Sequence, residues 1–219
     1  MKKPTKKDMQ TLIEHWRSLV PGQRPLTYGE LLQSAQVQAH HFRALADTDR
    51  LDINLIWLVE QTVVPINFVR SYVLGGESGL TTDEPDDILR VFINENEPFV
   101  RQRFSLLHEW KHVLDFPDHE RLYRDLGQGD QEKHYTLREA VANEFAAHVL
   151  MPTHLVKELW LKTPDLLLLA TLFNVSTEAI KRRLEKMGLI GDPQPRPRKY
   201  FRHIALIDTD RSTNTACVA

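Results

Sequence analysis

Cysteine is nearly absent from this sequence. Cys217 is the only one among 219 residues, so a disulfide within the chain is excluded, and so is a zinc site built from several thiolates. Because so little cysteine suits a reducing compartment, we expect a cytoplasmic protein.

Long hydrophobic runs are also lacking. The longest, residues 166–173, is interrupted by a threonine and is far shorter than the roughly 20 apolar residues that span a bilayer. The N-terminus carries several lysines, but no apolar segment follows them, so it is not typical of a secretion signal. We expect a soluble, unexported protein with no membrane contact.

A surplus of positive charge is missing too, because the formal net charge is −2. Strong attraction of the whole protein to nucleic acid is therefore not implied, although the net charge does not exclude a local basic patch. Apolar residues make up 42% and charged residues 26%, so a normal hydrophobic core can form. The length fits one domain with additions, or two small domains.

Residues 1–45 predict an N-terminal helical extension. Apolar positions in residues 9–20 recur at helical spacing until Pro21 and Gly22 end the pattern. A second helix follows, with Thr27 and Glu30 as a capping box. The next histidines are adjacent and point to different helical faces, so we interpret them as surface residues: His40 and His41.

Residues 46–160 are predicted to form the main domain. Leu51 to Val63 indicates a buried helix or a helix–strand pair, and residues 63–69 and 89–94 predict strands of a small antiparallel sheet. Two stretches between these strands have turn chemistry: 75–79 and 81–87. We expect 89–94 to be an edge strand, where an extended peptide can add main-chain hydrogen bonds.

The segment 103–114 contains His-Glu-x-x-His on a predicted helix. His108 and His112 are four apart and lie on one helical face, so both imidazoles can reach one metal ion. Glu109 lies beside the open side of that metal, where it can take a proton from a metal-bound water. Apolar neighbours also allow the plain interpretation of a core helix, but we favour a metal site.

A catalytic zinc site usually needs a third protein ligand. One candidate lies directly downstream, as in proteases that extend the motif with a glycine turn and a third histidine. Here Asp115 stands at the glycine position, and Asp118, with His119 next to it, stands at the position of the last histidine. The missing glycine counts against this geometry.

The second candidate is Glu139, on a predicted helix whose small residues let it approach another helix closely. Glu139 and Asn143 are four apart and share a face. We predict that Glu139 binds the metal and that Asn143 accepts a ring N–H from a liganding histidine. The plain alternative for Glu139 is an acid that favours the helix N-terminus. Glu144 and His148 lie on another side, and we interpret them as a surface pair.

Three ordered blocks closely resemble the ImmA/IrrE family of metallopeptidases: residues 103–112, 139–152 and 169–184. The resemblance covers about residues 60–190 and implies a zincin-like fold. It implies zinc bound by His108, His112 and Glu139, with Glu109 as general base. It also implies a protein substrate, a helix-turn-helix repressor whose cleavage releases stress-response or mobile-element genes.

The chain departs from the family pattern at three positions. Trp110 and Lys111 stand where the family often has small residues, and Val141 stands where it often has a second acid. None of these positions needs to bind metal, so the departures concern packing. The expected fold class is α+β: a mostly helical zincin-like metallopeptidase domain with a small antiparallel sheet, followed by a helix-turn-helix-like helical unit.

That helical unit is predicted at residues 161–190, with Ser176 as N-cap of its second helix and Gly188 as its end. Eight lysines and arginines against two acids make residues 181–202 basic, so a DNA contact stays open. We favour the alternative that the unit packs on the peptidase domain or holds a protein substrate, because no base-reading set of residues is present. Residues 191–219 predict a Pro-rich linker and a tail, with room for a strand at 200–207.

The leading hypothesis is zinc-dependent peptide-bond hydrolysis with one zinc ion per chain, in which Glu109 passes the proton of water to the leaving amine. Candidate donors to the developing oxyanion are His134, Tyr135 and His148. The competing hypothesis is a DNA- or repressor-binding regulatory module whose metal is structural, so that a chelator would not affect its binding. Hydrolysis of a small non-peptide substrate would use the same ligands.

Overall fold

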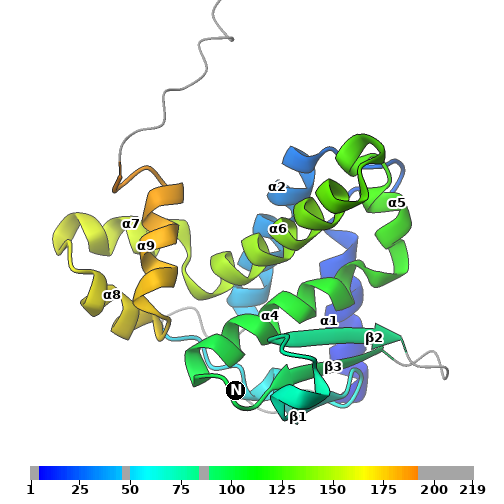
Figure 1. Ribbon diagram of the computed structural model, residues 1–219, viewed down its shortest axis with the longest axis horizontal. Helices are drawn as coiled ribbons and strands as arrows, with labels where there is room; N and C mark the ends of the chain where they lie inside the picture. Colours follow the sequence, from blue (N-terminus) through cyan, green and yellow to red (C-terminus); the bar gives the residue numbers. More distant parts are fainter. Residues whose placement is uncertain (1–4, 46–49, 84–88, 192–219) are drawn as a thin grey trace, which may run out of the picture.

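The computed structural model describes residues 5–45, 50–83 and 89–191. The predicted linker after Gly191 and the predicted strand at 200–207 lie outside these residues. Figure 1 shows a small sheet beneath helix α4, helix α6 crossing above α4, and a group of shorter helices to one side. The predicted α+β class is confirmed.

Two helices open the chain. Helix α1 (Lys6–Ser18) begins earlier than the apolar pattern indicates, because Thr5 and Asp8 form a capping box ahead of it. Helix α2 (Tyr28–Leu45) begins at the predicted box, in which the backbone N–H of Thr27 donates to the Glu30 carboxylate at 2.9 Å. His40 is exposed, as the surface interpretation predicts, whereas His41 is half-buried, with a ring nitrogen 3.2 Å from a ring nitrogen of His15. Both helices bury apolar residues in the main core.

The predicted helix or helix–strand pair at 51–63 is shorter than expected. Helix α3 covers only Ile56–Val59. The side-chain oxygen of Gln61 then accepts hydrogen bonds from the backbone N–H groups of Val63 and Val64, at 2.7 and 2.9 Å. These bonds form a turn, and strand β1 starts after it (Ile66–Val69).

The sheet has three strands in the order β1–β3–β2, and it is mixed instead of antiparallel. Strand β3 (Leu89–Asn94) pairs in parallel with β1 and antiparallel with β2 (Gly79–Asp83). The prediction of 89–94 as the edge strand is therefore wrong. Val91 and Ile93 are fully buried, so this apolar strand takes the centre, where both of its edges are paired. The two edge strands are β1 and β2, and β2 is a segment whose glycine and threonines indicated a turn.

Helix α4 (Phe99–Asp115) packs on the sheet and carries the His-Glu-x-x-His motif. It ends at Asp115, and a 3-10 turn and helix α5 (His119–Tyr123) follow. Helix α6 (Gln131–Leu150) then crosses α4, capped by the Asp130 side chain, which accepts from the N–H of Lys133 at 3.0 Å. Figure 1 shows α6 lying over α4, with α2 behind it.

Three helices form the predicted helix-turn-helix-like region and its approach: α7 (Thr153–Lys162), α8 (Leu166–Phe173) and α9 (Thr177–Lys186). Ser176 caps α9 as predicted, accepting from the N–H of Ala179 at 3.1 Å. The unit packs on the rest of the molecule through Arg103 of α4. The Arg103 guanidinium donates to the carbonyl of Asn174 at 2.5 Å and to that of Ile53 at 2.7 Å.

One contiguous core of buried side chains runs from Met9 in α1 to Leu184 in α9. The predicted extension and the predicted helical unit both contribute to it. Among the described residues, no helix combines the length and the apolarity that a bilayer crossing requires.

Candidate metal centre

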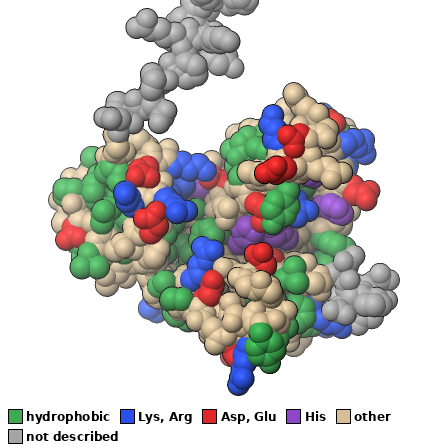
Figure 2. All heavy atoms as spheres, viewed as in Figure 1, with side chains coloured by type: hydrophobic (Ala, Val, Ile, Leu, Met, Phe, Trp, Pro, Cys, Tyr) green, Lys and Arg blue, Asp and Glu red, His purple; other side chains and the backbone are tan. Residues whose placement is uncertain are grey.

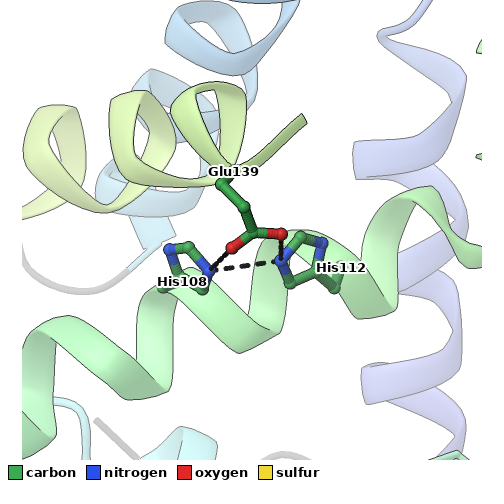
Figure 3. A group of neighbouring side chains, drawn as sticks. All are labelled: His108, His112 and Glu139. Carbon is green, nitrogen blue, oxygen red and sulfur yellow. Dashed lines mark hydrogen bonds and ion pairs between the residues drawn. The ribbon is translucent and has the colours of Figure 1, made fainter. Parts of the chain in front are cut away.

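Helices α4 and α6 bring three potential ligands together (Figure 3). The His108 Nε2 atom lies 2.9 Å from Glu139 Oε2 and 3.2 Å from His112 Nε2. The His112 Nε2 atom lies 3.5 Å from Glu139 Oε1. All three ligand atoms are within 4.8 Å of one another. The residues predicted as metal ligands therefore converge on one point, although they are separated along the chain.

The apolar faces of the two helices explain this convergence. Leu107, Trp110 and Val113 of α4 are fully buried, which turns His108 and His112 toward α6. On α6, small side chains face the core and permit close contact: Ala142 and Ala146. Helix periodicity then places Glu139, about one turn before Ala142, opposite the imidazoles.

Electrostatics in the cluster favour an ionised carboxylate. Burial raises the pKa of Glu139, but the hydrogen bonds and charges of His108 and His112 outweigh burial and lower that pKa well below its ordinary value. Burial lowers the pKa of His108, whereas Glu139 and Glu109 raise it, and the net shift is upward. Two imidazole nitrogens and one carboxylate oxygen form a donor set that suits zinc. These residues therefore fit the predicted metal.

Asn143 lies where it was predicted, behind His108. Its side-chain oxygen is 3.0 Å from His108 Nδ1. An amide oxygen only accepts hydrogen bonds, so Nδ1 carries a proton and Nε2 is the nitrogen that can bind a metal ion. This hydrogen bond aims Nε2 of His108 at the centre of the cluster.

Glu109, the predicted general base, is buried at the inner end of the same site, with 7% of its surface exposed. Its Oε2 accepts a hydrogen bond from the Thr81 hydroxyl of strand β2 at 2.8 Å. Sequence reasoning missed Thr81, because no local pattern indicates that a segment with turn chemistry will lie against the motif.

A cavity of about 750 Å³ contains the cluster. Figure 2 shows histidine side chains in the hollow between the sheet and the helices above it. The side chains at this cavity include the cluster and residues from β2, α5 and α6: Leu80, Thr81, Phe104, His108, Glu109, His112, His119, Tyr135, Arg138, Glu139 and Asn143. The cluster therefore lies in a cavity lined by strand β2 and by helices α4, α5 and α6.

Of the three predicted oxyanion donors, Tyr135 alone lines this cavity. The Glu139 carboxylate raises the pKa of the Tyr135 phenol, so the phenol keeps its proton and can donate. A ring nitrogen of His134 instead lies 3.0 Å from the backbone oxygen of Tyr123. His148 lines a different cavity. Arg138, which sequence reasoning did not select, lines the site with its guanidinium 5.5 Å from the Tyr135 ring centre.

The interpretation of Glu144 and His148 as a surface pair is wrong. The pair exists, at 2.9 Å, but only 3% of the Glu144 side chain is exposed. Gln36 of α2 donates to the same carboxylate at 2.8 Å, and Lys186 of α9 also binds it. The spacing of four residues indicated the pair, whereas its burial depends on two distant helices.

The alternative third ligands, Asp118 and His119, are not part of the cluster. Asp118 pairs with Arg121 at 3.3 Å, and a ring nitrogen of His119 lies 3.1 Å from the Phe116 carbonyl oxygen. His119 does line the cavity. His119 is therefore a suitable control position for substitutions in the cluster, because it lines the same cavity without belonging to the cluster.

A family comparison now identifies the chain. The family model for Peptidase_M78, described as an IrrE N-terminal-like domain, matches residues 68–185, which is more than half of the sequence. The chain belongs to the IrrE N-terminal-like family. The matched range begins in β1, includes the whole His-His-Glu cluster and ends in α9. The resemblance found in the sequence blocks is thereby confirmed.

Peptidase_M78 is a metallopeptidase family, so membership agrees with the metal-binding character of the cluster. Among solved structures, the IrrE-like chain is similar to a Mycobacterium tuberculosis transcriptional regulator, with a TM-score of 0.53 and 18% identity. The similarity covers 85% of this chain and 53% of that one, so the chain spans about half the length of its structural neighbour. At this identity the likeness shows the fold alone. No curated protein matches the sequence.

Proposed function

We propose that this protein is a zinc-dependent endopeptidase in which His108, His112 and Glu139 hold one zinc ion and Glu109 is the general base. The observation that carries the proposal is the convergence of the three ligand atoms beside the buried Glu109 carboxylate. Membership of a peptidase family supports it.

Each residue has a defined task in this mechanism. Zinc, when bound, supplies Lewis acidity toward the scissile carbonyl and the attacking water. Glu109 accepts a proton from that water and later transfers it to the leaving amine. Tyr135 and Arg138 line the cavity as donors to the developing oxyanion. Asn143 holds the His108 ring in its ligating tautomer.

We propose a helix-turn-helix transcriptional repressor as the substrate, whose cleavage would release stress-response or mobile-element genes. Two observations support this class. The structural neighbour is named a transcriptional regulator, and the open cavity beside the edge strand β2 suits an extended polypeptide. Cleavage would take place in the cytoplasm, where such repressors act.

Metal analysis of the purified protein tests the zinc site. We expect about one zinc ion per chain in the wild type and little in His112→Ala or Glu139→Ala, because two ligands hold zinc poorly. His119→Ala is the matched control, since it alters a cavity histidine outside the cluster and should keep its zinc. Equal zinc content in all four proteins would rule out this ligand set.

Cleavage of a repressor encoded beside the gene tests the activity. Glu109→Gln should keep zinc and lose turnover by at least about 100-fold, the usual contribution of a general base. If wild type and Glu109→Gln cleave equally, Glu109 is not the base. If neither cleaves but both bind the repressor with or without chelator, the protein is a regulatory binding module.

A further inference from the structure

Strand β2 contacts the Glu109 side chain through two of its residues. The Thr81 hydroxyl lies 2.8 Å from Glu109 Oε2, and 3.3 Å from the backbone oxygen of the same residue. The shorter distance identifies the carboxylate as the main acceptor. One carboxylate oxygen is therefore held by a donor, and Oε1 remains to exchange protons.

Gly79 is the second contact. A Cβ atom at this position would lie 2.9 Å from Glu109 Cγ and 3.0 Å from Oε1, closer than van der Waals contact allows. The φ angle of Gly79 is not in the left-handed region, so its backbone does not require glycine. Glycine is needed here because the strand lies directly on the Glu109 side chain. An alanine at position 79 would displace the Glu109 carboxylate without straining the backbone of the strand.

Register explains how both residues reach the same target. Residues 79 and 81 are two apart on one strand and point to the same face. Their partners on β3 are Ile93 and Val91, which fix β2 against the buried centre of the sheet. The position of the general base is thus linked to the position of an edge strand that closes one side of the cavity.

We infer that Thr81 is a positioning residue for the general base, and that Gly79 provides the space in which the Glu109 carboxylate is held. This inference rests on the proposed function, and it adds that strand β2 sets the orientation of the general base, Glu109. A carboxylate held by one hydrogen bond keeps a single orientation toward the attacking water, whereas a free one samples several. Small misplacements of a catalytic group cost up to about 100-fold in rate.

Three threonine variants test this role. Thr81→Val keeps the shape and removes the donor, so kcat should fall about 10- to 100-fold with KM nearly unchanged and zinc retained. Thr81→Ser keeps the hydroxyl and should restore most of the rate. Thr82→Val is the matched control, because the neighbouring Thr82 hydroxyl is buried without a hydrogen-bond partner. Its kcat should equal that of the wild type.

Gly79→Ala tests whether the Glu109 carboxylate needs the space that glycine leaves, and it should lower kcat in the same way. Gly29→Ala is the control, because nothing lies within 4 Å of a Cβ atom at that position. A crystal structure of Thr81→Val gives a readout besides activity: the Glu109 side chain should adopt another rotamer. The inference would be overturned if Thr81→Val had a kcat equal to or above that of the wild type, or if Thr81→Ser were as slow as Thr81→Val. Neither result would affect the proposed peptidase activity, which is tested by comparing the wild type with Glu109→Gln. If no repressor is cleaved by the wild type, the rotamer decides, and an unmoved Glu109 overturns the inference.

Discussion

At the scale of single residues, the site depends on neighbours that orient the ligands. Asn143 orients the His108 ring, because its side-chain oxygen accepts a hydrogen bond from Nδ1 at 3.0 Å. Glu139 stays ionised because both histidines lower its pKa. The cluster therefore combines an ionised carboxylate with two imidazole rings, a donor set that could hold a metal ion.

Asn143→Ala should weaken zinc binding by roughly 10- to 100-fold, the usual effect of removing a hydrogen bond to a liganding histidine. Asn143→Asp keeps an oxygen acceptor and should bind zinc close to the wild-type level. Competition with a chromophoric chelator measures both affinities. Thr136→Ala, at an exposed position of the same helix, is the control. An Asn143→Ala variant with wild-type affinity would show that the hydrogen bond does not orient His108.

At the scale of elements, the buried Arg183 is one of the contacts that join helix α9 to the rest of the molecule. Only 4% of Arg183 is exposed. Its guanidinium donates to the Met151 carbonyl at 3.1 Å and to the Thr153 hydroxyl at 2.8 Å, at the junction of α6 and α7. The preceding residue, Arg182, pairs with Glu178 on the solvent face, and 76% of its side chain is exposed. These contacts agree with a helical unit that packs on the peptidase domain.

Arg183→Ala should lower the free energy of unfolding by about 2–4 kcal/mol, because it removes two buried hydrogen bonds and leaves the Met151 carbonyl unpaired. Arg182→Ala should leave stability nearly unchanged, since exposed ion pairs contribute little. Urea denaturation followed by circular dichroism compares the two adjacent substitutions. If both variants lowered the free energy of unfolding equally, the buried hydrogen bonds of Arg183 would not be what stabilises the position of α9.

At the scale of the whole molecule, Glu144 connects three segments that are far apart in the sequence. Its buried carboxylate binds Gln36 of α2, His148 of α6 and Lys186 of α9. Burial raises the pKa of Glu144, but these partners outweigh burial and hold the pKa well below its ordinary value of 4.5. The unfolded chain therefore takes up this proton more readily than the folded one, so the Glu144 contacts stabilise the fold most when the group is ionised.

This depressed pKa predicts a pH-dependent contribution to stability. Glu144→Gln should cost roughly 1–3 kcal/mol at pH 7. The difference in the free energy of unfolding between the wild type and Glu144→Gln should be complete above the unfolded pKa of about 4.5. It should shrink as the pH falls below that value. Urea denaturation of both proteins from neutral to acidic pH measures the difference. Glu158→Gln, in an exposed pair with Lys162, is the control, because solvent screens that pair. A wild-type advantage that is constant with pH would contradict this role for Glu144.

The sequence by itself determined what depends on local spacing. Helix periodicity placed His108 and His112 on one face and Glu139 beside Asn143, and cap patterns at Thr27 and Ser176 located two helix starts. Such features need only a few neighbouring residues, so they can be recognised without knowledge of the rest of the chain.

Only the tertiary structure decided what depends on contacts between distant segments. It placed β3 in the centre of a mixed sheet, positioned Thr81 and Gly79 against the Glu109 side chain, and buried Glu144 among three helices. Strand order and burial follow from how the whole core packs. The same local pattern of residues fits an edge strand or a central strand, and the same spacing of four residues fits an exposed pair or a buried pair. For that reason the three residues of the cluster could be predicted from the sequence, whereas the contact between Thr81 and Glu109 could not.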